Sequence, residues 1–157
     1  MSDLMVEVGE KIPSVTLNDT EMKSVSLPAD IKGKTVLAFF PGAFTGVCTK
    51  EMCTFRDDMS KLSAIKANVM AISVDSPFAN KGFKEHNKLT FTVLSDYNRV
   101  AVTAFKIELN DFAGLKGYVA AKRSVFIVDV SGVVKYKWVS DDPRVEPNYN
   151  EVEAALA

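Results

Sequence analysis

Residues 35–53 read TVLAFFPGAFTGVCTKEMC, and the rest of the chain is organised around them. The first six are almost all apolar, which predicts a strand at 35–40 covered on both faces. A helical pattern starts at Cys48 and runs to about Lys66, with apolar residues three or four apart at Met52, Phe55, Met59 and Leu62 and then Ile65. Cys48 therefore lies in the first turn of a helix. Unpaired N–H groups and the helix dipole favour an anion there, so we expect its thiol to lose a proton easily.

The remaining pattern predicts alternating strands and helices. We expect strands at 15–17, 69–75, 91–96, 124–129 and 133–139, helices at 78–86, 99–105 and 149–156, and an irregular loop at 108–122. The Ser131-Gly132 turn makes the last two strands an antiparallel hairpin. The fold class is therefore α/β, with a central mixed β-sheet flanked by helices.

Length and composition narrow the class of protein. With 157 residues, 47% of them apolar, the chain is expected to form a single domain over 1–157. A net charge of −1 gives no basic surface for nucleic acid. No apolar run approaches the ~20 residues that span a bilayer, and residues 1–4 do not begin a signal peptide. We therefore expect a cytoplasmic protein without membrane or nucleic-acid partners.

The two cysteines are the chemically active candidates. In a reducing compartment, Cys48 and Cys53 are more often reactive or metal-binding than permanently bridged. With His86, the one histidine, they offer three ligands, whereas structural zinc takes four. We expect no metal, and His86 is interpreted as a polar residue on the face of its helix. The C-x-x-C pair of a disulfide reductase is absent.

Several of these residues resemble a known family. Pro41, Thr45 and Cys48 match the P-x-x-x-T-x-x-C signature of peroxiredoxins, and Arg123 precedes an apolar strand as in that family. Residues 41–57 are similar to the bacterioferritin comigratory protein (PrxQ) branch, which often has a second cysteine at the position of Cys53. Residues 41–47 resemble the loop of the AhpE and peroxiredoxin-5 types. The resemblance covers nearly the whole chain in element order.

The resemblance implies a thioredoxin-like fold and a role for each matching residue. Cys48 would attack a hydroperoxide and become a sulfenic acid, Thr45 would hydrogen-bond the peroxide and thiolate, Pro41 would shield the pocket, and Arg123 would neutralise charge. Taken alone, the same residues also fit a buried inert cysteine, a helix-capping threonine and a solvated arginine.

Two nearby charged residues leave further alternatives. Arg56, two turns along the helix from Cys48, is the second candidate for the neutralising arginine. Glu51 either supports the site by contacting one of the two arginines or is a favourable acidic residue in the first helical turn.

Cys53 poses a geometric problem. Five residues along a helix separate two Cα atoms by about 8–9 Å on different faces, whereas a disulfide requires them within roughly 7 Å. If Cys53 resolves the sulfenic acid, the first helical turns must unwind in each cycle, and Gly42 and Gly46 favour such unwinding. The alternative is a core cysteine in a one-cysteine enzyme that an external thiol resolves.

The expected function is thus a thiol-dependent peroxidase for hydrogen peroxide and small organic hydroperoxides. Its reductant would be a thioredoxin-like or other dithiol, and no metal, flavin or haem cofactor is implied. A peroxide-sensing redox switch or a chaperone using the same disulfide is the alternative from another class. The expected assembly is a monomer or a homodimer.

Overall fold

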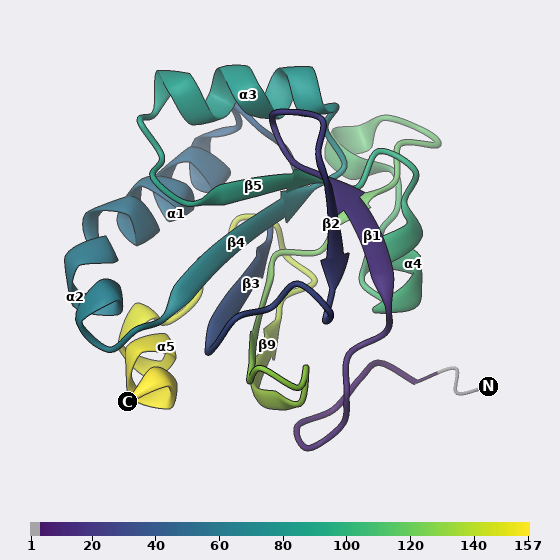
Figure 1. The fold of residues 1–157 in the computed structure, drawn as a ribbon. Coiled ribbons are helices and arrows are strands. Elements are labelled where there is room, and N and C mark those ends of the chain that lie inside the picture. The colour runs from purple at the N-terminus through teal and green to yellow at the C-terminus, as the bar shows by residue number, and fades with distance from the viewer. Residues whose placement is uncertain (1–3) are drawn as a thin grey trace.

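A seven-stranded sheet forms the centre of the computed structural model (Figure 1). Its strands are β1 (Val15–Asn18), β2 (Ser24–Leu27), β3 (Thr35–Phe39), β4 (Asn68–Ser73), β5 (Thr92–Ser95), β8 (Ser124–Val128) and β9 (Val134–Val139). Their order across the sheet is β2-β1-β5-β4-β3-β8-β9. The pairs β3–β4 and β4–β5 are parallel, and the others are antiparallel. The predicted mixed sheet is confirmed.

The structure describes residues 4–157, apart from the side chains of Met59, Ser60 and Ser63. Residues 1–3, part of the segment interpreted as lacking a signal peptide, lie outside the described residues, and so does the side chain expected to be apolar at Met59. Within the described part, no helix combines the length and the apolar character needed to cross a bilayer.

Helices cover both faces of the sheet. They are α1 (Gly46–Asp57), α2 (Met59–Ala64), α3 (Pro77–His86), α4 (Val100–Ala104) and α5 (Tyr149–Leu156), with a short 3₁₀ turn at Phe112–Gly114. Buried side chains of α1, α2, α3 and α5 pack on the sheet face that carries Val36, Ala38 and Phe40. Side chains of α4 pack on the opposite face.

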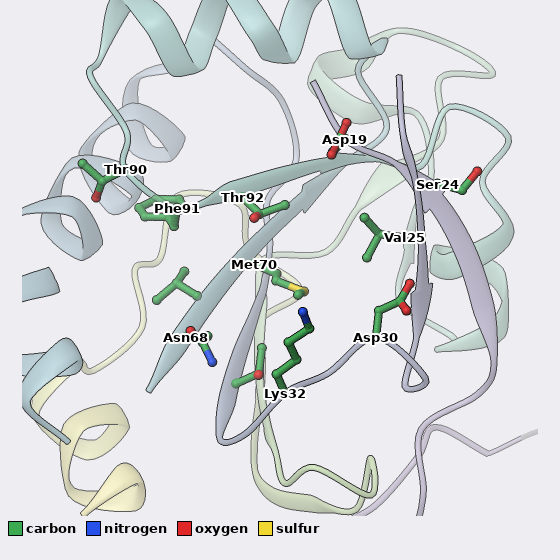
Figure 2. A pocket seen from close by; sticks show the side chains of 12 residues that line it. Asp19, Ser24, Val25, Asp30, Lys32, Asn68, Met70, Thr90, Phe91 and Thr92 are labelled. Atoms are coloured by element: carbon green, nitrogen blue, oxygen red, sulfur yellow. The ribbon is translucent and has the colours of Figure 1, made fainter. Parts of the chain in front are cut away.

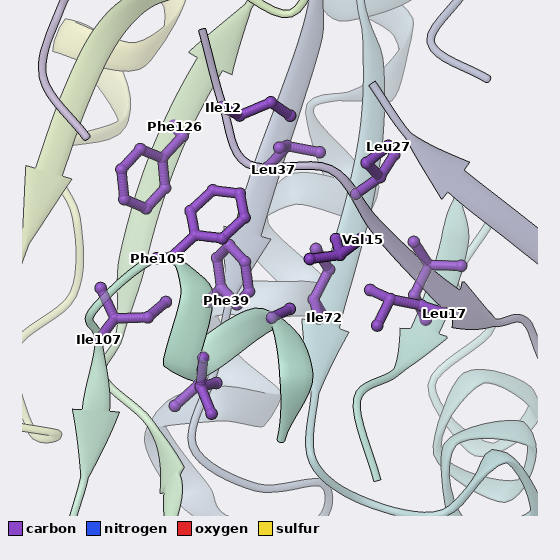
Figure 3. Close-up of a cluster of buried hydrophobic side chains, with 14 of the residues drawn as sticks. Ile12, Val15, Leu17, Leu27, Leu37, Phe39, Ile72, Phe105, Ile107 and Phe126 are labelled. Carbon is purple, nitrogen blue, oxygen red and sulfur yellow. The ribbon is translucent and has the colours of Figure 1, made fainter. Parts of the chain in front are cut away.

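Alternation along β3 divides the core between these two faces. Leu37 and Phe39 lie on the face that α4 covers, and there the ring of Phe39 lies 5.0 Å from that of Phe105 and 6.0 Å from that of Phe126 (Figure 3). All five residues of β3 are buried, as expected for a strand covered on both sides.

Three details differ from the sequence-based expectation. The helix expected to continue to Lys66 breaks at Asp58, a poor helix former that follows another aspartate, and α2 ends at Ala64 so that Ile65 is 39% exposed. The strand β2 was not predicted. The loop at 108–122 contains a small two-stranded sheet, β6 (Glu108–Leu109) and β7 (Ala120–Ala121).

Candidate active site

Cys48 is the third residue of α1, immediately after the loop that follows β3. The predicted position in a first helical turn is confirmed. The N-cap residue Thr45 makes no side-chain capping bond, and the backbone N–H of Thr49 donates to the Thr45 carbonyl at 2.9 Å. The earlier N–H groups of the helix therefore precede its first internal hydrogen bond and are oriented to receive negative charge. The side chain of Cys48 is 1% exposed.

Arg123 is the cation that contacts this sulfur. Its Nη2 donates to Cys48 Sγ at 3.0 Å, and its Nη1 donates to Glu51 Oε1 at 2.7 Å. Both Nε and Nη2 also donate to the carbonyl of Pro143, at 3.3 and 2.8 Å. The planar fork of one guanidinium thus joins a thiol, a carboxylate and a backbone carbonyl. Arg123 is itself only 1% exposed.

The sheet register explains how residues 75 positions apart meet. Phe39, at the end of β3, pairs with Ser124 at the start of antiparallel β8. The loop after β3 and the residue before β8 therefore lie side by side at the same end of these two strands. Arg123 occupies that position and reaches the start of α1.

Glu51 contacts Arg123, which confirms the first of its two interpretations. It lies in the second turn of α1, so the first-turn alternative is wrong, since no acidic residue occupies that turn. Complete burial raises the pKa of Glu51 to about 7, although the charge of Arg123 lowers it. Within the described residues, its Oε2 atom is buried without a hydrogen-bond partner. Protonation of the carboxyl removes the larger cost of keeping a buried negative charge on an oxygen without a partner.

The expectation that the Cys48 thiol ionises easily is wrong for this conformation. Burial raises the pKa of Cys48 above its ordinary value of 9.0. The charge of Arg123 and hydrogen bonds from Thr45, Gly42 and Arg123 lower it, but they do not cancel the effect of burial. The helix position alone could not predict this, because desolvation depends on how completely the surrounding fold covers the sulfur.

Thr45 lies between the loop and the sulfur. Its hydroxyl donates to the carbonyl of Gly42 at 2.7 Å, and its hydrogen bonding also lowers the pKa of Cys48. A hydroxyl has one proton, so it can serve the carbonyl or the sulfur, but not both at once. Pro41, the third residue of the signature, is buried directly after Phe40.

The loop before α1 is held by residues that no motif in the sequence identifies. The backbone N–H of Ala43 donates to Asp75 Oδ2 at 2.8 Å, and the hydroxyl of Ser73 donates to the same oxygen at 2.7 Å. Asp75 follows β4, the parallel neighbour of β3. Its place directly after a buried parallel strand is the signal that could have identified it, because neighbouring parallel strands have their carboxyl ends on the same side of the sheet. Pro143 contributes a backbone carbonyl, which no side-chain pattern identifies.

Cys53 and Arg56 point to a different neighbour. Cys53 Sγ donates to Asn87 Oδ1 at 3.7 Å, and both cysteines are free thiols. Arg56 donates through Nη1 to the Asn87 carbonyl at 2.6 Å and contacts Asp57. Arg56 is therefore not the arginine beside Cys48, and that alternative is wrong.

His86 is exposed on α3, where its ring lies 5.9 Å from that of Phe44. This agrees with its interpretation as a residue of a helix face. In the part of the chain that the structure describes, no three His, Cys, Asp or Glu side chains gather as a metal-binding group.

A separate groove of about 560 Å³ opens at the end of the sheet where the parallel strands begin (Figure 2). Thr35, Asn68 and Thr92 line it at the beginnings of β3, β4 and β5. Cys48 lies beyond the end of β3. The groove and the Cys48 site are therefore at opposite ends of the parallel strands.

Comparison with known proteins shows which family has a similar sequence. A model of the AhpC/TSA family matches residues 8–137. The chain is 38% identical over 136 residues to peroxiredoxin bcp of Coxiella burnetii, covering 86% of this chain and 89% of that protein. It is 36% identical over 132 residues to the chloroplastic peroxiredoxin Q of Oryza sativa subsp. japonica, covering 83% of this chain and 58% of that protein.

Solved structures agree with these sequence matches. The crystal structure of peroxidoxin BcpB from Mycobacterium tuberculosis superposes with a TM-score of 0.83 at 26% identity, covering 98% of this chain and 97% of that one. Peroxiredoxin Q of Xanthomonas campestris shares the fold, with a TM-score of 0.76 at 24% identity over 90% of this chain and 89% of that one. The chain belongs to the AhpC/TSA family and is a peroxiredoxin, a thiol-dependent peroxidase with a thioredoxin-like fold.

Proposed function

We propose that the chain reduces hydrogen peroxide and small organic hydroperoxides with Cys48 as the attacking residue. The contact of Arg123 Nη2 with Cys48 Sγ at 3.0 Å, at the start of a helix, carries this proposal. The thiolate attacks one peroxide oxygen, the O–O bond breaks, and the products are a Cys48 sulfenic acid and an alkoxide or hydroxide that takes a proton. Arg123 faces the charge that this step moves.

The neighbours of Cys48 take distinct parts in the proposed reaction. Thr45 turns its hydroxyl from the Gly42 carbonyl toward the sulfur or the peroxide. Pro41 closes the site to water. Glu51 orients Arg123 through their 2.7 Å ion pair, and it leaves more of the arginine's charge to the sulfur when it is protonated.

In the proposed second step, Cys53 condenses with the sulfenic acid, forming a disulfide and releasing water. A thioredoxin-like or other dithiol then reduces this disulfide by exchange and is itself oxidised. The second step requires part of α1 to unwind, because the helix separates the two Cα atoms by about 8–9 Å.

The experiment treats reduced wild type, Cys48→Ser and Cys53→Ser with one equivalent of hydrogen peroxide. Free thiols are counted and intact masses measured. We expect an internal disulfide in wild type, a sulfenic or over-oxidised Cys48 in Cys53→Ser, and no fast reaction in Cys48→Ser. Fast peroxide consumption by Cys48→Ser would refute the assignment.

A second candidate is a one-cysteine peroxidase. It is favoured by the Cys53–Asn87 contact, which holds the second thiol away from the first. In that case Cys53→Ser turns over as fast as wild type with an external monothiol, and wild type forms no internal disulfide. A redox switch is distinguished by turnover, because a switch is oxidised once and stops even when reductant is in excess.

A further inference from the structure

The side chain of Asn87 is fixed so that its oxygen faces Cys53. Asn87 is the C-cap residue of α3, and its Nδ2 donates to the Phe83 carbonyl at 3.0 Å. Because the amide nitrogen is bound on that side, the oxygen is directed away from α3. Cys53 Sγ donates to this oxygen at 3.7 Å.

A second contact joins the same two helices. Arg56, one turn beyond Cys53 on α1, donates to the backbone carbonyl of Asn87 at 2.6 Å. Its Nε and Nη2 atoms are 3.0 and 2.9 Å from Asp57 Oδ1, which fixes the guanidinium. Phe55, which is fully buried between these positions, anchors the same turn in the core.

These contacts divide α1 into two parts. Residues 46–53 contain both cysteines and must lose their helical form before the two sulfur atoms can meet. Residues 54–57 are held by the buried ring of Phe55 and by the hydrogen bond of Arg56, whereas unwinding of residues 46–53 also has to take Met52 out of the same core. The Cys53–Asn87 hydrogen bond lies at the boundary, and unwinding must break it.

We propose that Asn87 is a positioning residue, a latch that holds Cys53 in the helix and so slows formation of the Cys48–Cys53 disulfide. The inference rests on the proposed role of Cys53 as the resolving cysteine. Condensation of the Cys48 sulfenic acid with the Cys53 thiol forms the S–S bond and releases water. In competition, a second hydroperoxide oxidises the sulfenic acid to a sulfinic acid and is reduced to an alcohol or water. The latch therefore sets the ratio of resolution to over-oxidation.

Asn87→Ala and Asn87→Asp form a matched pair for the test. Both remove the Nδ2 donor to Phe83, whereas Asn87→Asp keeps an oxygen acceptor for the thiol. The backbone of Asn87 has φ −96° and ψ 3°, which either residue adopts without strain. Arg56 contacts only the backbone carbonyl, so its contact is available in both variants.

The measurement is a single turnover of the reduced full chain with hydrogen peroxide, quenched in acid and resolved by intact mass. We expect disulfide formation in Asn87→Ala to be roughly two- to tenfold faster than in wild type, as the loss of one hydrogen bond predicts. The rate of Cys48 oxidation is unchanged, so less sulfinic acid accumulates at each peroxide concentration. Asn87→Asp resolves at the wild-type rate or more slowly. At equilibrium, the same change lowers the reduction potential of the disulfide in Asn87→Ala by about 10–30 mV.

Equal acceleration in Asn87→Ala and Asn87→Asp would overturn the latch, because the effect would then come from the end of α3. Unchanged disulfide formation in Asn87→Ala would also overturn it. In a Cys53→Ser background, Asn87→Ala must leave over-oxidation unaltered, and a decrease there would place its effect on Cys48 instead. If Asn87→Ala does not fold, Asn87→Ser, whose shorter side chain cannot reach the thiol, takes its place. The absence of any disulfide in wild type is the separate result that refutes the proposed function.

Discussion

Replacing Glu51 by glutamine should change how the stability of the protein depends on pH. Burial raises the pKa of Glu51 from its ordinary value of 4.5 to about 7 in the folded chain. A carboxyl shifted in this direction favours the folded state while it is protonated, below pH 4.5. That contribution is lost as the pH rises through 7. Wild type therefore becomes less stable from acidic to mildly alkaline pH because of this one group, and Glu51→Gln does not.

The size of the effect follows from the two pKa values. Between pH 5 and pH 8, Glu51 contributes a loss of ~2.5 kcal/mol to the unfolding free energy of wild type. The difference in stability between Glu51→Gln and wild type should grow in favour of the variant by that amount over the same interval. Groups common to both chains cancel in this difference.

The assay is urea unfolding of the reduced proteins at pH 5.0, 6.5 and 8.0, followed by the fluorescence of Trp138, the single tryptophan. Glu146→Gln is the matched control. Although burial raises the pKa of Glu146, hydrogen bonds from Tyr149 and Lys50 bring it below its ordinary value. Its own contribution is therefore already present by pH 5, and the difference for Glu146→Gln should change up to pH 8 only by the small part with which the Glu146 charge raises the pKa of Glu51. A pH-independent difference for Glu51→Gln would show that Glu51 is ionised in the folded chain and would refute the reasoning.

Substitutions at three further positions test other parts of the structure. Arg123→Lys keeps a cation but loses the planar fork, so the stopped-flow rate of Cys48 oxidation should fall by about a hundredfold, and a wild-type rate would remove the guanidinium from the mechanism. Asp75→Ala leaves a loop N–H unpaired and should lower stability by ~1–3 kcal/mol in urea unfolding, whereas Asp75→Asn, which keeps an acceptor, should lose less. Gly132→Ala would place a Cβ atom 2.5 Å from Pro28 Cβ at a φ of +84°, so we expect ~2–4 kcal/mol of destabilisation, and a loss below ~1 kcal/mol would contradict the close approach.

The sequence predicted the elements whose pattern is local. The apolar runs at 35–40 and 124–129 contain β3 and β8 to within a residue, because strands buried on both faces have an unmistakable composition. The break at Asp58 and the strand β2 escaped prediction. A single poor helix former rarely decides where a long apolar pattern stops, and β2 is mostly only half-buried or exposed.

The candidate site could likewise be predicted only in part from the sequence. The residues of the signature and Arg123 could be selected from the sequence by resemblance, and the structure brings Arg123 and Thr45 to Cys48. Contacts made by backbone atoms, such as the Pro143 carbonyl, leave no trace in side-chain identity. The direction of the Cys48 pKa shift was missed because burial is a property of the assembled fold, whereas helix position can be inferred from sequence.

Because Phe39 pairs with Ser124, the register between β3 and β8 decides whether Arg123 reaches Cys48. Displacing β8 by one residue would turn the side chain of Arg123 to the opposite face of the sheet, and displacing it by two would carry the guanidinium roughly 7 Å along the strand. Neither shift alters any atom of the thiol, yet each would leave it without a cation. Substitutions in β3 and β8 that loosen this alignment should therefore abolish peroxide reduction while the thiol itself remains intact.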